Sequence, residues 1–223
     1  DDNEGHITAA SEPRDAGGPE PIKPAWVRCL MDFDPGNRSN WDPRWDIHRS
    51  PLWQYVQSEE IFKCPADKSL VSVGDKAMPR VRSMAMNVHC GAWGEGEKTY
   101  WFGYRVYQKE SDFVDPGPSS TFLFLDVRED AVNYGNFLVG MKGYPDFPEQ
   151  MLIFDFPASY HNRAATLSFV DGHSEVKKWQ HPDTMPPLVK GGLLPQIAEM
   201  PTTLSSPGNP DVRWLQDHNT RLP

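Results

Sequence analysis

The pattern of hydrophobic and polar positions predicts a protein built from short strands. Residues 121–125 form a continuous apolar run of strand length after a turn-rich segment, so we expect a buried central strand there. Three other segments are rich in β-prone residues and predict further strands, at 61–65, 81–88 and 99–107.

The clearest predicted element is a β-hairpin near the C-terminal end. Residues 164–170 and 173–179 flank Asp171-Gly172, and Asp-Gly between two alternating runs is the strongest short-range hairpin signal. We expect Asp171 and Gly172 to be the left-handed residues of a tight two-residue turn. With such a turn, the hairpin closes the sheet.

A two-residue turn also determines which side chains share a face of the hairpin. Ala165, Leu167 and Phe169 alternate along the first strand and therefore share one face. Val176 is expected opposite Leu167, where it continues that face, and Trp179 is expected on the other face.

Regular helix is expected to be scarce. Only residues 50–56 start like a helix, with Ser50 as the N-cap. Residues 1–23 have no periodicity and predict an extended leader, whereas 24–223 fit one globular head whose Pro-rich tail wraps the surface from about residue 180. The expected fold class is α+β, with an antiparallel sheet, a C-terminal hairpin and long loops.

Composition supports this picture and excludes some functions. The 223 residues include 22 Pro and 17 Gly, and 12% are aromatic, which favours short strands and ordered loops over a helical bundle. A net charge of -9 argues against a nucleic-acid partner, because phosphate binding needs clustered Lys and Arg. The sequence has no run of about eighteen apolar residues, which a membrane-spanning helix needs.

The three cysteines do not form a metal or redox motif by spacing. Cys29, Cys64 and Cys90 include no C-x-x-C pair, so a zinc ribbon and a thioredoxin-type site are excluded. One disulfide and one free thiol remain compatible with the sequence, with Cys64 paired to Cys90 or to Cys29.

Several phrases, in a fixed order along the chain, carry a family resemblance. They are D-D-N-E-G-H at 1–6, F-K-C-P-A-D at 62–67, R-S-M-A-M-N at 82–87, His161 followed by Asp171-Gly172, a W-x-x-P-x-T-x-P-x-L stretch at 179–188 and N-P-D-V-R-W-L-Q at 209–216. Asp126 also falls where an acidic residue follows an apolar strand. The set resembles the prepilin-type, processing-associated proteins with an H-x(9)-D-G signature, which are type IV pilin-like proteins similar to the major pseudopilins of type II secretion.

This resemblance implies a pilin-like head in the cell envelope or outside the cell. Family members carry an N-terminal helix that follows a prepilin-peptidase cleavage site, anchors the protein in the membrane and forms the filament core. The chain resembles a head that begins just after this helix, which would pack on the sheet of the intact protein. The implied partners are other pilin-like subunits or secretion machinery, and the implied roles are filament assembly, secretion, or binding of a substrate or an adhesive target.

The signature residues also suggest a divalent metal site. His161, Asp171 and His173 are expected near one end of the hairpin, joined by Asp126 and Asn87. Oxygen ligands alone would favour calcium, which some major pseudopilins bind in a C-terminal loop, and two imidazoles would favour zinc. The plainer alternative, which we prefer because Asp-Gly is so often only a turn, is that Asp171 bonds its own turn and His161 caps a carbonyl.

Aromatic residues suggest a second kind of site. Four tryptophans lie among polar residues and are candidates for stacking on sugar rings of an extracellular polysaccharide: Trp41, Trp45, Trp93 and Trp101. The alternative is that these rings anchor irregular chain to the core, which is the commoner role of Trp in a loop-rich domain.

Enzymatic activity is the weaker expectation. Ser159 and Ser168 lie near His161 in the sequence, and Asp126 or Asp171 would complete a hydrolytic triad. Asp126 with Asp171 would also suit a glycosidase. However, the sequence has no G-x-S-x-G, H-E-x-x-H, P-loop or G-x-G-x-x-G motif. A secreted glycoside or ester hydrolase is therefore kept as the alternative to a binding or assembly protein.

Overall fold

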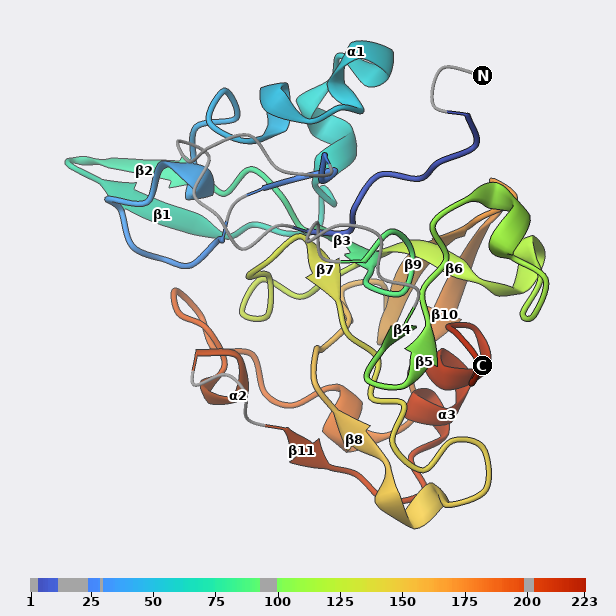
Figure 1. Cartoon of the computed structure of the whole chain (residues 1–223). Coiled ribbons are helices and arrows are strands. Elements are labelled where there is room, and N and C mark those ends of the chain that lie inside the picture. The colour runs from blue at the N-terminus through green and yellow to red at the C-terminus, as the bar shows by residue number, and fades with distance from the viewer. Residues whose placement is uncertain (1–3, 12–23, 29, 93–99, 199–202) are drawn as a thin grey trace.

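The computed structural model describes residues 4–11, 24–28, 30–92, 100–198 and 203–223 (Figure 1). Short strands and long connections make up most of it, and its longest helix is α3, Pro210–Asp217. The fold is α+β with few helices and mainly antiparallel sheets, as the sequence predicted.

A five-stranded sheet forms the centre of the molecule, in the order β10-β9-β6-β3-β7. Its strands are β3 (Met84–Asn87), β6 (Phe122–Asp126), β7 (Asn136–Phe137), β9 (Ala164–Phe169) and β10 (Ser174–Lys178). All neighbours are antiparallel except β7, which runs parallel to β3. The apolar run at 121–125 is the middle strand β6, so the predicted central strand is confirmed.

Two apolar cores lie on the two faces of this sheet. The larger contains Leu125 and Leu167 and is covered by α3 through Val212 and Leu215. The smaller contains Met86, which packs with other residues from the N-terminal half of the chain, among them Trp26, Ile47 and Phe62. Because β3 and β6 contribute side chains to both cores, the sheet is a rigid base for side chains at its ends.

Smaller elements surround the sheet. In the described residues, three two-stranded ribbons pair β1 (Leu70–Val73) with β2 (Lys76–Pro79), β4 (Tyr100–Trp101) with β5 (Tyr104–Arg105), and β8 (Leu152–Ile153) with β11 (Leu204–Ser205). The short helices there are α1 (Trp53–Val56), α2 (Pro195–Ala198) and α3. The 3-10 turns there are η1 (Arg38–Asn40), η2 (Ile47–Arg49), η3 (Glu59–Phe62), η4 (Glu110–Asp112), η5 (Pro118–Ser120), η6 (Pro148–Gln150) and η7 (Pro182–Thr184). The β1–β2 ribbon projects from one side of the molecule (Figure 1).

The predicted strands were only partly correct. Strand β3 lies within 81–88, and β4 and β5 lie within 99–107, but the strand expected at 61–65 is wrong. That segment is the end of η3 followed by a loop, because its backbone bonds within its own turns and to Ser83, and not to a strand ladder. Ser83 N–H donates to Phe62 O (3.0 Å), and the Ser83 hydroxyl accepts from Cys64 N–H (2.8 Å).

The C-terminal hairpin exists, but its register differs from the prediction. Phe169 N–H donates to His173 O and Gly172 N–H to Phe169 O, which closes a three-residue loop. Of the pair Asp171-Gly172, only Gly172 has a positive φ (91°).

This register moves the side chains to different faces. Val176 pairs with Thr166 and is 64% exposed, whereas Glu175 pairs with Leu167. Trp179 is buried in the same core as Leu167, so the predicted face is wrong for both Val176 and Trp179.

The tail is more regular than the prolines suggested. The helix α3 starts at Pro210, a position where the missing N–H removes no helical bond. Asn209 caps it by accepting from Asp211 and Val212 N–H. At residues 50–56, α1 is shorter than expected and begins at Trp53.

Candidate metal centre

Three side chains from distant parts of the sequence meet at one end of the central sheet. Asp126 ends β6, Cys64 follows η3, and His161 lies in the turn that enters β9. Their potential ligand atoms all lie within 4.8 Å of one another, and Cys64 Sγ is 3.3 Å from His161 Nε2. Among the described residues, this is the group of His, Cys, Asp and Glu that is close enough to hold a metal ion.

Asp126 is fully buried and only half satisfied. Its Oδ1 accepts the Ser83 hydroxyl at 2.8 Å, whereas Oδ2 has no hydrogen-bond partner in the described part of the chain. Burial raises the pKa of Asp126 to about 6, against the smaller lowering effects of the Ser83 hydroxyl and the Cys64 thiol. A buried carboxylate with a free oxygen is unfavourable unless a cation or a donor completes it.

Two hydrogen bonds hold Cys64 in place, one from its backbone and one to its sulfur. Its N–H donates to the Ser83 hydroxyl, and its Sγ accepts from Ala66 N–H at 3.4 Å. Burial, above all, raises the pKa of the Cys64 thiol, and nearby Asp126 raises it further. A catalytic cysteine needs the opposite shift, so without a bound cation Cys64 is a neutral thiol and a poor nucleophile.

Of the two disulfides that the sequence left open for Cys64, the one with Cys90 is not formed. Cys64 and Cys90 are both free thiols, and Cys90 is fully buried with its Sγ 3.9 Å from Phe122 O. Cys29 lies outside the described residues. Sequence could not settle this pairing, because a disulfide depends on the distance and direction of two Cβ atoms.

A strained turn presents the exposed His161. The next two residues, Asn162 and Arg163, both have positive φ angles, 55° and 68°. Such left-handed conformations are unfavourable for residues other than glycine, and for Arg more than for Asn. The turn is held by Arg163 N–H to Ser159 O (3.2 Å) and Trp179 N–H to Arg163 O (2.8 Å).

A groove of about 1000 Å³ borders this cluster on the Cys64 side. Polar and aromatic side chains line it, including Trp41, Glu59, Lys63, Asp67 and Arg80. Burial lowers the pKa of Lys63, whose Nζ lies 3.7 Å from Asp67 Oδ1. The groove therefore combines one aromatic ring, that of Trp41, with charges of both signs.

The structure does not bring the predicted metal ligands together as expected. His161 and Asp126 meet, but Asp171 and His173 lie at the opposite end of β9, six residues or roughly 20 Å away. There His173 Nδ1 bonds Asp171 Oδ1 at 2.6 Å, and this bond lowers the pKa of the exposed Asp171. The nine residues between His161 and Asp171 thus span one strand and its turn.

Asn87 also lies away from the cluster. Its amide nitrogen donates to Phe122 O (3.0 Å), and its oxygen accepts from His89 N–H (3.0 Å). In β3, Met84 pairs with Asp126, and Asn87 points to the opposite face of the sheet. Both polar atoms of the Asn87 side chain are therefore engaged in hydrogen bonds to the backbone.

The four candidate tryptophans have different positions. Trp41 lines the groove and donates from Nε1 to Pro35 O (3.1 Å). The ring of Trp45 is covered by the Arg38 guanidinium at 4.5 Å. Trp93 and the side chain of Trp101 lie outside the described part. Of the described rings, Trp41 is the one that borders a groove able to hold a ligand.

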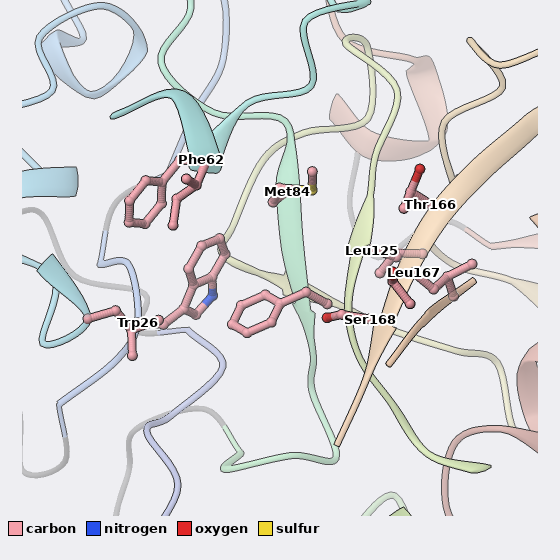
Figure 2. Close-up of a pocket in the computed structure, with 11 residues that line it drawn as sticks. Trp26, Phe62, Met84, Leu125, Thr166, Leu167 and Ser168 are labelled. Atoms are coloured by element: carbon pink, nitrogen blue, oxygen red, sulfur yellow. The ribbon is translucent and has the colours of Figure 1, made fainter. Parts of the chain in front are cut away.

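The serines proposed for a triad are not placed as nucleophiles. No hydrogen bond joins Ser159 or Ser168 to His161 within the described residues. Ser168 instead lines a separate apolar cavity of about 250 Å³, between β9 and the ring of Trp26 (Figure 2).

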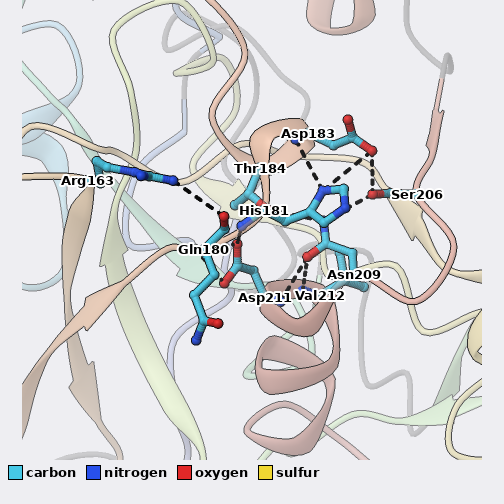
Figure 3. A network of polar contacts seen from close by, with 9 residues as sticks. All are labelled: Arg163, Gln180, His181, Asp183, Thr184, Ser206, Asn209, Asp211 and Val212. Atoms are coloured by element: carbon cyan, nitrogen blue, oxygen red, sulfur yellow. Dashed lines mark hydrogen bonds and ion pairs between the residues drawn. The ribbon is translucent and has the colours of Figure 1, made fainter.

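A second polar cluster fixes the C-terminal part of the chain (Figure 3). The buried Asp211 carboxylate accepts the N–H groups of Gln180 and His181 at 2.8 to 3.0 Å. The Asn209 amide donates to Thr184 Oγ1 and to the Ser206 hydroxyl. This network ties the segment after β10 to the start of α3.

Two residues of the metal centre were missed by sequence reasoning. Cys64 was considered only as a disulfide partner, and Ser83, which positions both Cys64 and Asp126, was not considered. A signal was available, because both residues lie inside the phrases at 62–67 and 82–87.

Comparisons with protein-family models, curated proteins and solved structures found no match to this chain. In the described residues, no helix has both the length and the apolar character required to cross a membrane.

Proposed function

We propose that the chain is a pilin-like head of the pseudopilin type that acts outside the cytoplasm through binding and assembly. In this role it works in a filament, in secretion or in capture of a substrate. Its partners are other pilin-like subunits or secretion machinery. Neither a nucleic acid nor direct contact of this head with a membrane is part of the proposal.

One observation carries the proposal: the separate phrases that resemble this family converge in space. Cys64 comes from the phrase at 62–67 and Ser83 from 82–87, while Asp126 and His161 come from two further matches. Ser83 bonds Cys64 and Asp126, and Cys64 contacts His161. Four chance matches would have no reason to meet at one end of a sheet.

The last two phrases also meet each other. Asp211 and Asn209 belong to the stretch at 209–216, and they bond Gln180, His181 and Thr184 within 179–188 (Figure 3). Contact between these phrases supports their origin in one folding unit. It therefore favours the family resemblance over coincidence.

The site chemistry favours binding over hydrolysis. Cys64 has a raised thiol pKa, and Ser159 and Ser168 have no bond to the His161 ring within the described residues. A hydrolase needs a nucleophile or water that is activated by an adjacent base. The groove beside Cys64, by contrast, is large enough for an extended ligand.

Envelope fractionation of the source cells tests the proposal. Antibodies against this chain are expected to label sheared surface filaments or the envelope fraction, and cross-linking is expected to join it to pilin-like subunits. Exclusive recovery in the cytosol, without such cross-links, would overturn the proposal.

Glycan capture is a second candidate role, favoured by Trp41 at the groove. Binding isotherms on insoluble polysaccharides are expected to weaken in Trp41→Ala, while the matched variant Trp45→Ala binds normally because Arg38 already covers that ring. Flat isotherms for the wild type on every glycan would remove this role, and release of reducing sugar would instead support the hydrolase.

A further inference from the structure

We propose that Cys64, Asp126 and His161 form a binding site for a transition-metal ion of the zinc class, with a fourth coordination position open to solvent. This site is independent of the assembly role, because its evidence is the geometry and chemistry of three side chains.

Ligand distances support a single shared ion. In a tetrahedral zinc site, with Zn–S near 2.3 Å and Zn–N near 2.0 Å, sulfur and nitrogen lie roughly 3.5 Å apart. Cys64 Sγ and His161 Nε2 are separated by 3.3 Å. All three ligand atoms, including an Asp126 oxygen, lie within 4.8 Å of one another, which is close enough for one ion to contact them all.

The donor set determines the class of metal. Calcium and magnesium take oxygen ligands, whereas a cysteine sulfur with an imidazole nitrogen selects zinc and related transition metals. The calcium alternative in the sequence prediction assumed oxygen ligands around Asp171, and the structure places Asp171 at the far end of β9.

The unpartnered oxygen of Asp126 is the independent sign of a missing cation. The carboxylate is fully buried, and its Oδ2 lacks a hydrogen-bond partner in the described part of the chain. Buried charges in proteins are paired or coordinate metals. Two positively charged groups of the groove are engaged elsewhere, since Lys63 donates to Arg80 O and the Arg80 guanidinium to Glu129 O.

Ser83 gives the site the fixed geometry that metal ligands need. Its single hydroxyl donates to Asp126 Oδ1 and accepts from Cys64 N–H. Residues that orient ligands in this way raise metal affinity. One serine, just before β3, thus sets the positions of two of the three ligands.

The fourth position is expected to be open. The described residues supply three ligands and no fourth His, Cys, Asp or Glu to this group, and the His161 side is exposed. Three protein ligands with a water or substrate in the fourth position are the arrangement of catalytic zinc sites, whereas structural sites are closed by four. The ion would therefore be able to accept a donor atom from a partner or ligand.

Cobalt titration tests this site directly. The full chain, untagged, reduced and freed of metal, is titrated with Co²⁺ and monitored for thiolate-to-cobalt charge-transfer absorption. The wild type is expected to bind one Co²⁺ per chain and to release it to Zn²⁺. Cys64→Ser, Asp126→Asn and His161→Gln are each expected to lose at least about tenfold in affinity.

Matched controls separate this site from others in the chain. Cys90→Ala removes a thiol outside the cluster, and His173→Gln removes the histidine at the other end of the hairpin, so both are expected to bind as the wild type does. Near-ultraviolet circular dichroism confirms that each variant is folded. Absence of one-to-one binding by the wild type, or loss of binding in His173→Gln but not in His161→Gln, would overturn the proposal.

Discussion

The two polar clusters of this molecule are built from similar residues but differ in how completely they are bonded. At the C-terminal cluster, both oxygens of Asp211 accept backbone N–H groups, and the Asn209 side chain makes bonds through both its ends. At the candidate metal centre, Asp126 has one oxygen bonded and one without a partner among the described residues.

This difference separates a cluster that stabilises the fold from a cluster that can still bind a ligand. A closed network holds chain segments together and has no capacity left for a ligand. An open cluster retains a destabilising buried group, which persists when a ligand compensates it or when the surrounding fold is strong enough to hold it. The same residue type therefore has opposite roles at its two sites.

The largest effect is expected from Asp211→Asn. Whichever way the amide is oriented, its NH₂ replaces one carboxylate oxygen and faces the buried Gln180 N–H, which donates to both oxygens in the wild type. We expect the free energy of unfolding to fall by about 3 kcal/mol, measured by urea denaturation. A loss below about 1 kcal/mol would show that this network is not the closed structural unit described above.

A third buried carboxylate, Asp155, gives a pH-dependent test of intermediate size. Its Oδ2 accepts only Leu138 N–H, and burial raises its pKa from 3.8 to about 7. Because the pKa of Asp155 is higher in the folded protein, the neutral carboxyl contributes to the free energy of unfolding. This contribution is fully present below pH 3.8 and is lost as pH rises through about 7. The slope is about 1.4 kcal/mol for each pH unit between these values.

The variant Asp155→Asn keeps an acceptor for Leu138 N–H and removes this titration. Denaturation at pH 5 and pH 8 is expected to show the wild type losing stability relative to the variant by more than about 1 kcal/mol. An unchanged difference between the two proteins at both pH values would contradict the burial of an ionised Asp155.

A smaller effect than that of Asp211→Asn is expected from Asp126→Asn in metal-free protein. Asn retains an acceptor for the Ser83 hydroxyl and removes a buried charge whose second oxygen has no hydrogen-bond partner among the described residues. The free energy of unfolding is therefore expected to stay within about 1 kcal/mol of the wild type or to rise. Destabilisation as large as that of Asp211→Asn would erase the distinction between the two clusters.

The smallest effect is expected from Asp171→Ala. This exposed side chain bonds only within its own turn, to the His173 N–H and ring, so we expect the free energy of unfolding, measured by denaturation, to stay close to that of the wild type. Metal stoichiometry is expected to be unchanged. Loss of the ion in this variant would show that the metal binds at the Asp171–His173 turn instead.

The local sequence pattern correctly predicted the elements that depend mainly on neighbouring residues in the chain. The apolar run gave the central strand, and Asp171-Gly172 gave the hairpin. The register was missed because it depends on a turn one residue longer than the commonest form, and a one-residue shift moves every side chain to the other face.

The candidate site could be predicted only in part. Asp126 and His161 were identified from their places in the sequence, but their third companion, Cys64, is 97 residues from His161 and reaches it through packing of the sheet. The Asp171–His173 pair was expected to join them because all these residues belong to one hairpin. In the structure, the length of β9 separates His161 at its start from Asp171 and His173 at its end.

Anomalous scattering from crystals grown with zinc would test the central claim most directly. The account predicts one strong zinc peak about 2.0–2.3 Å from Cys64 Sγ, His161 Nε2 and an Asp126 oxygen, with a fourth position facing solvent. A zinc peak at the Asp171–His173 turn with none at Cys64, or ordered crystals without zinc at either place, would contradict it.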